Sequence, residues 1–183
     1  EKNRVLAEAR ALRALAYFEL ETYFAVNMKD DNGVGVMLYN EVPPVLPNVP
    51  TPGRSTNGEV FASINEDLDF AEANLQAGNP VSWVTQNFIT GLRARMALYR
   101  GQFAEAQMYA QMVIDTYPVA NQGLTTRANY AAMWANTTTG DIIFGLERPR
   151  NKTGIVGNWF FNSATYGGGP FLEVSRALYN VLN

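Results

Sequence analysis

Apolar residues recur every three or four positions along most of the first 118 residues, a spacing that places them on one face of an α-helix. The pattern predicts four helices: one over residues 1 to about 26, one that begins after Thr56, and two within residues 87–118 that are joined at Gly101. Glycine can adopt the left-handed conformation that commonly ends a helix. Because one helix pair cannot cover its own outer face, we expect the four helices to pack as two antiparallel pairs.

The same spacing predicts which side chains face the core. On the first helix the inward residues would be Val5, Ala9, Leu12, Ala16, Leu20 and Tyr23, widened by Leu15 and Phe24, with Asn3, Arg10, Arg13 and Glu21 on the outer side. On the second helix they would be Val60, Ile64, Leu68, Ala71 and Leu75. On the last pair they would be Phe88, Leu92, Met96 and Tyr99, then Phe103, Ala106, Ala110, Val113 and Tyr117. Leu12, Leu68 and Ala110 are expected to be fully buried.

Thr56 and Glu59 have the spacing of a capping box, which marks the start of the second helix. The segment before it is rich in turn residues at 27–35 and in prolines at 43–53. A calcium loop is excluded at the first of these, because methionine and tyrosine would occupy its first and last ligand positions. We expect a solvated turn there, a short strand at Val34–Leu38, and an extended strap through the prolines.

The chain changes character near residue 126. The remainder holds a short helix, the strongest strand pattern of the chain, an irregular loop rich in glycine and aromatic residues, and a further helix, at residues 127–135, 141–147, 152–170 and 175–182 respectively. We expect Tyr130, Met133 and Trp134 to face inward. The predicted organisation is a helical region at 1–126 and a loop-rich region at 127–183. Since both ends fall within helical patterns, we expect the chain to be an internal fragment of a longer protein, with the second region part of the same domain as the first.

Composition excludes several classes of function. The net charge is −3 with no basic stripe, which disfavours nucleic acid as a partner. No run approaches the roughly 18 apolar residues of a membrane helix. The chain has no histidine and no cysteine, so it offers neither an imidazole base nor a thiol, and no His or Cys ligands for a metal. We therefore expect no enzyme, no metal and no cofactor.

Paired carboxylates are the first catalytic signal to consider, and Glu66, Asp67 and Asp69 lie close together in the second helix. Asp67 and Asp69 do not share a helical face, and all three flank the apolar stripe. We interpret them as a solvated edge of that helix and not as a catalytic pair.

The loop at 152–170 is the most plausible ligand surface. Trp159 and Tyr166 would offer flat apolar faces, and Asn158 and Asn162 would supply hydrogen bonds, a mixture that suits sugars. The alternative is that the rings only pack the loop onto the helical body. If the loop binds a ligand, we expect Trp159 and Tyr166 to stay exposed, while the rings without a polar tip anchor the loop, namely Phe160, Phe161 and Phe171.

Four motifs occur in a familiar order. They are AEARALRALAYFELETYF at Ala7–Phe24, Arg54-Ser55-Thr56 followed by Glu59-Val60-Phe61, Ile64, Asp67-Leu68 and Ala71, the alanine-rich helix pair at Ala94–Ile114, and Asp141-Ile142-Ile143-Phe144. With these motifs the chain resembles the SusD/RagB family of outer-membrane nutrient-binding lipoproteins of Bacteroidetes. The second helix of the alanine-rich pair is also similar to a tetratricopeptide unit.

The resemblance implies a mainly α fold of tetratricopeptide-like helix pairs forming an α-α superhelix, with one short strand and a long irregular loop. It implies non-catalytic binding of a glycan or other nutrient at the cell surface, and delivery to a SusC-like TonB-dependent transporter. The lipid anchor to the outer membrane would precede Glu1 in the full-length protein, and residues 127–183 would belong to a domain that continues in a C-terminal half missing from this chain. None of the matched motifs is a sugar-binding motif, so they assign no ligand residues. The alternative function is a tetratricopeptide-like protein-interaction scaffold without a small-molecule ligand.

Overall fold

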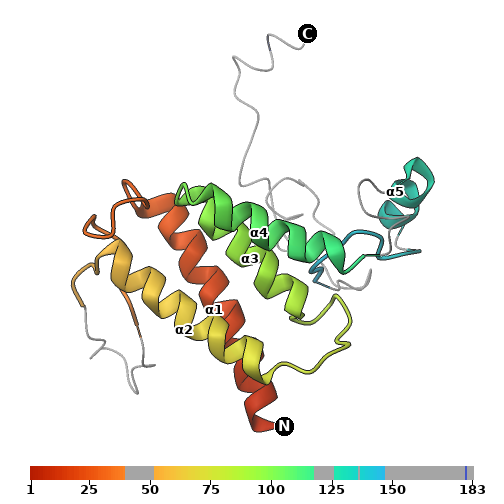
Figure 1. The fold of residues 1–183 in the computed structure, drawn as a ribbon, viewed down its shortest axis with the longest axis horizontal. Coiled ribbons are helices and arrows are strands. Elements are labelled where there is room, and N and C mark those ends of the chain that lie inside the picture. Colours follow the sequence, from red (N-terminus) through yellow and green to blue (C-terminus); the bar gives the residue numbers. More distant parts are fainter. Residues whose placement is uncertain (40–51, 118–125, 136, 147–179, 181–183) are drawn as a thin grey trace. The chain divides into compact units, whose positions relative to one another are not determined.

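The computed structural model describes residues 1–39, 52–117, 126–135, 137–146 and 180. The described residues form five helices: α1 Lys2–Phe24, α2 Asn57–Asn74, α3 Gln86–Tyr99, α4 Phe103–Asp115 and α5 Arg127–Trp134 (Figure 1). The chain divides into two compact units, Glu1–Leu146 and Glu147–Asn183. Most of the proline strap, the aromatic loop and the helix predicted at 175–182 lie outside the described residues, apart from Asn180, which is helical.

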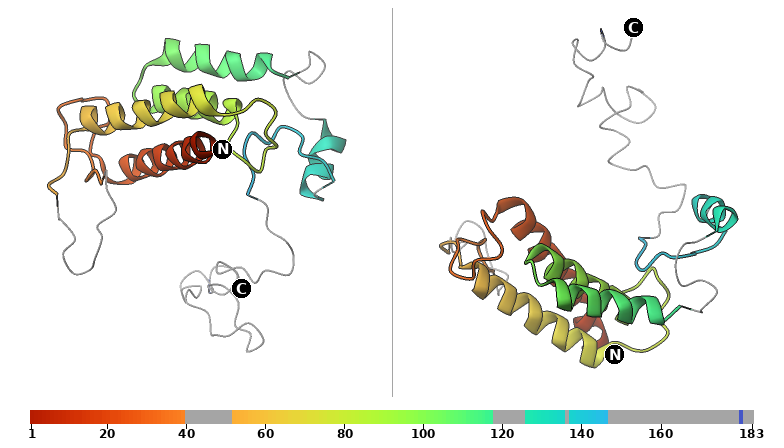
Figure 2. Two further views of the ribbon diagram at one scale, coloured as in Figure 1. Left: turned by 90° about the horizontal axis from the view of Figure 1, so that it is seen from below. Right: turned by 45° about the horizontal axis from the view of Figure 1, so that its top comes forward.

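The predicted mainly α fold is confirmed. Helix α1 packs along α2, helix α3 packs along α4, and α3 also touches α1 and α2. Figure 2 shows each pair running side by side in opposite directions, with α4 on the side of α3 that faces away from α1. These four helices therefore form the two antiparallel pairs that the apolar spacing predicts.

Helix α2 begins with the predicted capping box. The Thr56 hydroxyl accepts a hydrogen bond from the Glu59 backbone N–H at 3.2 Å, and the Glu59 carboxylate accepts one from the Thr56 backbone N–H at 2.8 Å. These two bonds satisfy amides that have no partner within the helix. All five apolar residues predicted to face the core from α2 are buried.

The turn between α3 and α4 is closed by Gly101, as predicted. Its φ of 76° lies in the left-handed region. The Gln102 N–H donates to the Ala97 carbonyl at 2.8 Å and the Gly101 N–H donates to the Leu98 carbonyl at 3.1 Å, which together make a Schellman motif. The carbonyls at the end of α3 are thus paired within a short connection, and α4 folds back directly onto α3.

The predicted inward face of α1 is wrong. The buried residues are Ala7, Ala11, Ala14, Tyr17, Phe18 and Glu21, whereas Leu12 is 42% exposed and Val5, Leu20, Tyr23 and Phe24 are also exposed. The actual stripe lies two residues from the predicted one, which is a rotation of about 200° around the helix. The buried face combines three alanines with Tyr17 and Phe18 in the core cluster, and it is covered in preference to the apolar residues on the opposite face.

Helix α4 is buried more narrowly than expected. Only Ala106 and Val113 are buried, while Ala110 is exposed and Phe103 is 66% exposed. The prediction that Ala110 is fully buried is therefore wrong. Within the described part of the chain α4 packs mainly on α3, so a single helix–helix seam determines which of its residues are covered.

Neither predicted strand forms within the described residues. Val34 makes one antiparallel bridge with Thr56, and residues 35–38 make no strand. Residues 141–146 are neither helix nor strand. The Gly145 N–H donates to the Val81 carbonyl at 2.9 Å, but no neighbouring strand among the described residues extends this bond into a ladder. The apolar residues there still contribute to the core. The rings of Phe144 and Phe88 pack edge-to-face, with their centroids 4.9 Å apart.

The short helix after residue 126 forms as predicted, but its rings are not covered. Tyr130 and Trp134 are exposed, and their rings pack edge-to-face with the centroids 6.1 Å apart. Met133 is half-buried against Gly140. The inward orientation predicted for the two rings is therefore wrong among the described residues.

Candidate functional site

The predicted ligand residues Trp159, Tyr166, Asn158 and Asn162 all lie outside the described residues. The structure therefore does not test this prediction. The described part of the chain offers other polar or hollow features that are candidate sites.

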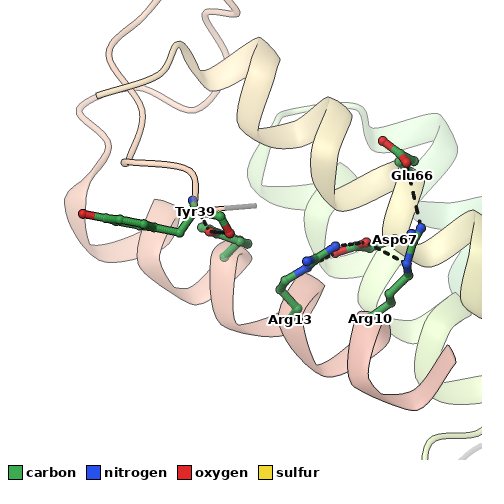
Figure 3. Close-up of polar contacts among 6 residues, drawn as sticks. Arg10, Arg13, Tyr39, Glu66 and Asp67 are labelled. Carbon is green, nitrogen blue, oxygen red and sulfur yellow. Dashed lines mark hydrogen bonds and ion pairs between the residues drawn. The ribbon is translucent and has the colours of Figure 1, made fainter. Parts of the chain in front are cut away.

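The first is a charged network between α1 and α2, shown in Figure 3. Asp67 is only 2% exposed and accepts two hydrogen bonds from the Arg13 guanidinium, at 2.6 and 2.7 Å, while Arg10 approaches the same carboxylate at 3.8 Å. Hydrogen bonding to Asp67 raises the pKa of Arg13. The expectation that Asp67 is solvated is wrong, because the arginines of α1 fold over it.

This network does not provide a catalytic pair. Glu66 extends to solvent with its side chain 79% exposed, and Asp69 pairs with Arg93 at 2.6 Å on the other side of α2. Asp67 is neutralised by the bidentate contact with Arg13, which is a strong and directional form of ion pair. The arrangement joins α1 to α2 and leaves no carboxylate of this cluster positioned for acid–base chemistry.

The second feature is a buried carboxylate at the end of α1. Glu21 is fully buried, its Oε1 accepts a hydrogen bond from the Val36 N–H at 2.8 Å, and its Oε2 has no hydrogen-bond partner among the described residues. A Cβ at Gly35 would lie 2.6 Å from the same Oε1, so a larger residue there would displace the carboxylate. Arg54 completes the junction by donating to the carbonyls of Gly35 and Phe24, at 2.6 and 2.7 Å.

Burial raises the pKa of Glu21, although the Val36 N–H and the charge of Arg54 both favour the ionised form. The folded state therefore holds this proton more tightly than the unfolded chain does. The resulting stability is complete below the ordinary glutamate pKa of about 4.3 and is lost as the pH rises through the higher folded pKa.

Glu21→Gln should remove this dependence while keeping an acceptor for Val36. We expect its free energy of unfolding, relative to that of the wild type, to increase between pH 4 and pH 8. Urea unfolding across this range measures the difference, and Glu66→Gln, at an exposed carboxylate, controls for the loss of one charge. A difference that stays constant with pH would contradict the prediction.

The third feature is an apolar groove of about 550 Å³ beside the exposed face of α1. Leu20 and Phe24 of α1 line it together with Val36, Met37 and Tyr39. The Tyr17 hydroxyl holds one wall in place, because it donates to the Tyr39 carbonyl at 3.1 Å and accepts from the Tyr39 N–H at 2.7 Å. The groove is well formed, but nothing in the described structure shows what would occupy it.

A second hollow, of about 450 Å³, lies where the α2–α3 connection meets the end of α4 and residues 139–143. We call it the polar hollow. None of its lining residues in the described structure carries a charge. Amides and hydroxyls predominate, with Asn79, Thr85, Gln86, Asn87, Thr116 and Thr139 among them.

The polar hollow is not predicted from the sequence. Its residues come from three segments that are distant in the chain, and each segment has the composition of an ordinary helix end or turn. The amide cluster at Gln76, Asn79, Gln86 and Asn87 on either side of Pro80 is the signal that would have indicated it. Elsewhere in the described part of the chain, no group of three or more acidic residues could hold a metal ion, and no helix has the length and apolarity to cross a bilayer.

Comparison with solved structures shows proteins with the same arrangement of helices. A candidate sugar-binding protein of Bacteroides vulgatus ATCC 8482 has 25% sequence identity and a TM-score of 0.62 over 78% of this chain. A SusD superfamily protein of Bacteroides thetaiotaomicron VPI-5482 has 25% identity and a TM-score of 0.57 over 72% of this chain. The chain has a fold similar to that of SusD superfamily proteins. A SusD-like carbohydrate-binding protein of Bacteroides vulgatus also matches, with 23% identity and a TM-score of 0.57 over 71% of the chain.

The chain spans only 33%, 28% and 27% of the lengths of those three proteins, in the same order. No protein-family model and no curated protein sequence matches it. The motifs that carry the resemblance have structural roles: Arg54 closes the end of α1, Thr56 caps α2, and Asp67 of the second motif pairs with Arg13 of the first. They stabilise the helical fold of this chain and assign no ligand contact.

Proposed function

We propose that this chain is part of a non-catalytic protein that binds a glycan or other nutrient at the cell surface. The observation that carries the proposal is the SusD-like fold, shared with solved proteins that are described as carbohydrate-binding or sugar-binding. The absence of histidine and cysteine from the sequence and the neutralisation of Asp67 by Arg13 support a binding role over a catalytic one.

The finer parts of the proposal come from the family resemblance. We infer delivery of the ligand to a SusC-like TonB-dependent transporter, and a lipid anchor in the outer membrane of the full-length protein. Trp159, Tyr166, Asn158 and Asn162 remain proposed ligand residues, because their mixture of rings and amides suits a sugar.

A protein-interaction scaffold is the second candidate function. It is favoured by the exposed apolar residues of α4, namely Phe103, Met108, Met112 and Ile114. Such a helix face often marks a contact with another protein or with a further helix. A scaffold would bind a protein through α4 and would bind no glycan.

The intact protein is expected to bind a neutral polysaccharide without releasing reducing ends. Affinity electrophoresis against a panel of neutral and acidic polysaccharides measures binding, and a reducing-sugar assay after prolonged incubation measures hydrolysis. Co-expression with a SusC-like transporter of the same organism, followed by purification through a tag on the transporter, tests the partnership. Release of reducing ends would overturn the non-catalytic assignment. Failure to bind any glycan, with retention of a protein partner, would favour the scaffold.

A further inference from the structure

The polar hollow has a composition that selects among ligand classes. It has no charged residue in its described lining, so an ionic ligand entering it would lose hydration without a compensating ion pair. An entirely apolar ligand would leave the amide and hydroxyl groups of the lining without partners, which is also costly. The composition therefore favours a neutral ligand with many hydroxyl groups.

Three amides of the hollow are oriented by hydrogen bonds to neighbouring groups. The Asn79 side chain donates to the Val84 carbonyl at 3.0 Å, and the Gln86 side chain donates to the Glu72 carbonyl at 3.0 Å. A carbonyl can only accept, so each amide must present its nitrogen there. The side-chain oxygens of both amides accept no hydrogen bond from any described residue.

Asn87 is fixed by a relay of the same kind. Its side chain donates to the Thr116 hydroxyl at 2.8 Å, and that hydroxyl donates in turn to the Val113 carbonyl at 2.7 Å. Because the Thr116 proton is used in the second bond, Thr116 must accept in the first. Asn87 is thus a third lining residue whose side-chain amide is oriented by a hydrogen bond. Its side-chain oxygen accepts no hydrogen bond from any described residue.

Hydroxyl groups of a sugar are the donors that such acceptors require, and the lining also supplies apolar surface. Val81, Ile142 and Ile143 can contact the C–H face of a sugar ring, and Tyr117 contributes an aromatic ring to the same lining. The volume of about 450 Å³ is within the usual range for small-molecule sites. Acceptors that are already oriented reduce the entropy lost on binding.

We propose that the polar hollow is a binding site for a neutral saccharide, with the side-chain oxygens of Asn79, Gln86 and Asn87 as acceptors for its hydroxyl groups. This site is distinct from the loop residues proposed above, and it rests on the proposed function in that the whole protein must bind a glycan.

Ala77→Trp tests the hollow by filling it. Ala77 is exposed and lines the hollow, so the indole should compete with the ligand without disturbing the core. We expect the dissociation constant of the intact protein for its best neutral oligosaccharide, measured by calorimetry, to rise about tenfold or more. Ala73→Trp is the matched control, since Ala73 is exposed on α2 four residues earlier and does not line the hollow.

Asn79→Ala tests the acceptors directly and should weaken binding by about 3- to 10-fold, as expected for the loss of one neutral hydrogen bond. Its control is Asn74→Ala, which removes an asparagine that also donates to a backbone carbonyl, that of Phe70 at 2.8 Å, away from the hollow. Thermal unfolding verifies that each variant and its control lose similar stability.

The outcomes separate the two proposals. Weaker saccharide binding by Ala77→Trp and Asn79→Ala, with both controls near wild type, supports the hollow. If the wild type binds a neutral saccharide and both variants bind it equally well, the hollow is overturned while the proposed function stands; a hollow that accepts peptides instead would give this result. If the wild type binds only acidic saccharides, the hollow alone is overturned. If it binds no saccharide, both proposals fail.

Discussion

Leu68→Ala is expected to lower the free energy of unfolding by about 2–5 kcal/mol, the usual cost of a buried leucine truncation. Leu68 is fully buried on α2 and belongs to the same core cluster as Phe18 and Ile64. Because neighbouring side chains in a packed core relax only partly, the deletion removes apolar contact and leaves a cavity. Urea unfolding followed by circular dichroism measures the change.

Leu12→Ala is the matched control, since it makes the same chemical change on the neighbouring helix. Leu12 is on the exposed face of α1, so its truncation should change stability by less than about 1 kcal/mol. Equal losses from the two variants would mean that α1 packs through its large apolar residues, and would contradict the burial of its alanine face.

Helix α2 shows what can be predicted from sequence. Its start depends on Thr56 and Glu59, and its buried face depends on apolar residues spaced by three and four. Both signals are local, and the face they select is also the face that the neighbouring helices cover. The turn at Gly101 is predictable for the same reason, because it needs a left-handed backbone conformation and glycine adopts that conformation at little cost.

Helix α1 shows where prediction from spacing fails. It has two apolar faces, the predicted one and one that combines alanines with Tyr17 and Phe18, and periodicity alone does not choose correctly between them. The choice between them depends on how closely α2 can approach, which is a property of the pair. Buried Glu21 could not be predicted for the same reason: the N–H that it accepts from, at Val36, becomes available only when residues 35–36 fold against the end of α1.

Sequence alone indicates the polar hollow only through the amides on either side of Pro80, for a topological reason. Asn79, Asn87, Thr116 and Thr139 are unremarkable in their own segments, and only the packing of those segments places them around one space. The family resemblance did not help, because its motifs consist of core, capping and ion-pair residues. Two of these motifs meet at Arg13 and Asp67, but this contact between α1 and α2 is known only from the structure, since Asp67 is expected from the sequence to be solvated.

The second large effect on stability is expected at the Arg13–Asp67 contact. Asp67→Ala is expected to lower the free energy of unfolding by about 2–4 kcal/mol. The substitution would leave Arg13 and Arg10 without the carboxylate that both approach, and the hydrogen bonds to Arg13 are short and bidentate. We place the value at the lower end for a buried pair because the Arg13 side chain is 40% exposed, so water can solvate the guanidinium once its partner is lost.

Asp69→Ala is the control for Asp67→Ala, since Asp69 also pairs with an arginine but its side chain is 70% exposed. An exposed pair contributes about 0–1 kcal/mol, so this variant should remain near wild type. A double-mutant cycle with Arg13→Ala then isolates the Arg13–Asp67 coupling, which should persist at high salt because the carboxylate is shielded from solvent. If the two aspartate variants lose the same small amount, or if the coupling vanishes in salt, Asp67 belongs to a solvated edge of α2 and the two motifs are held together by the alanine face alone.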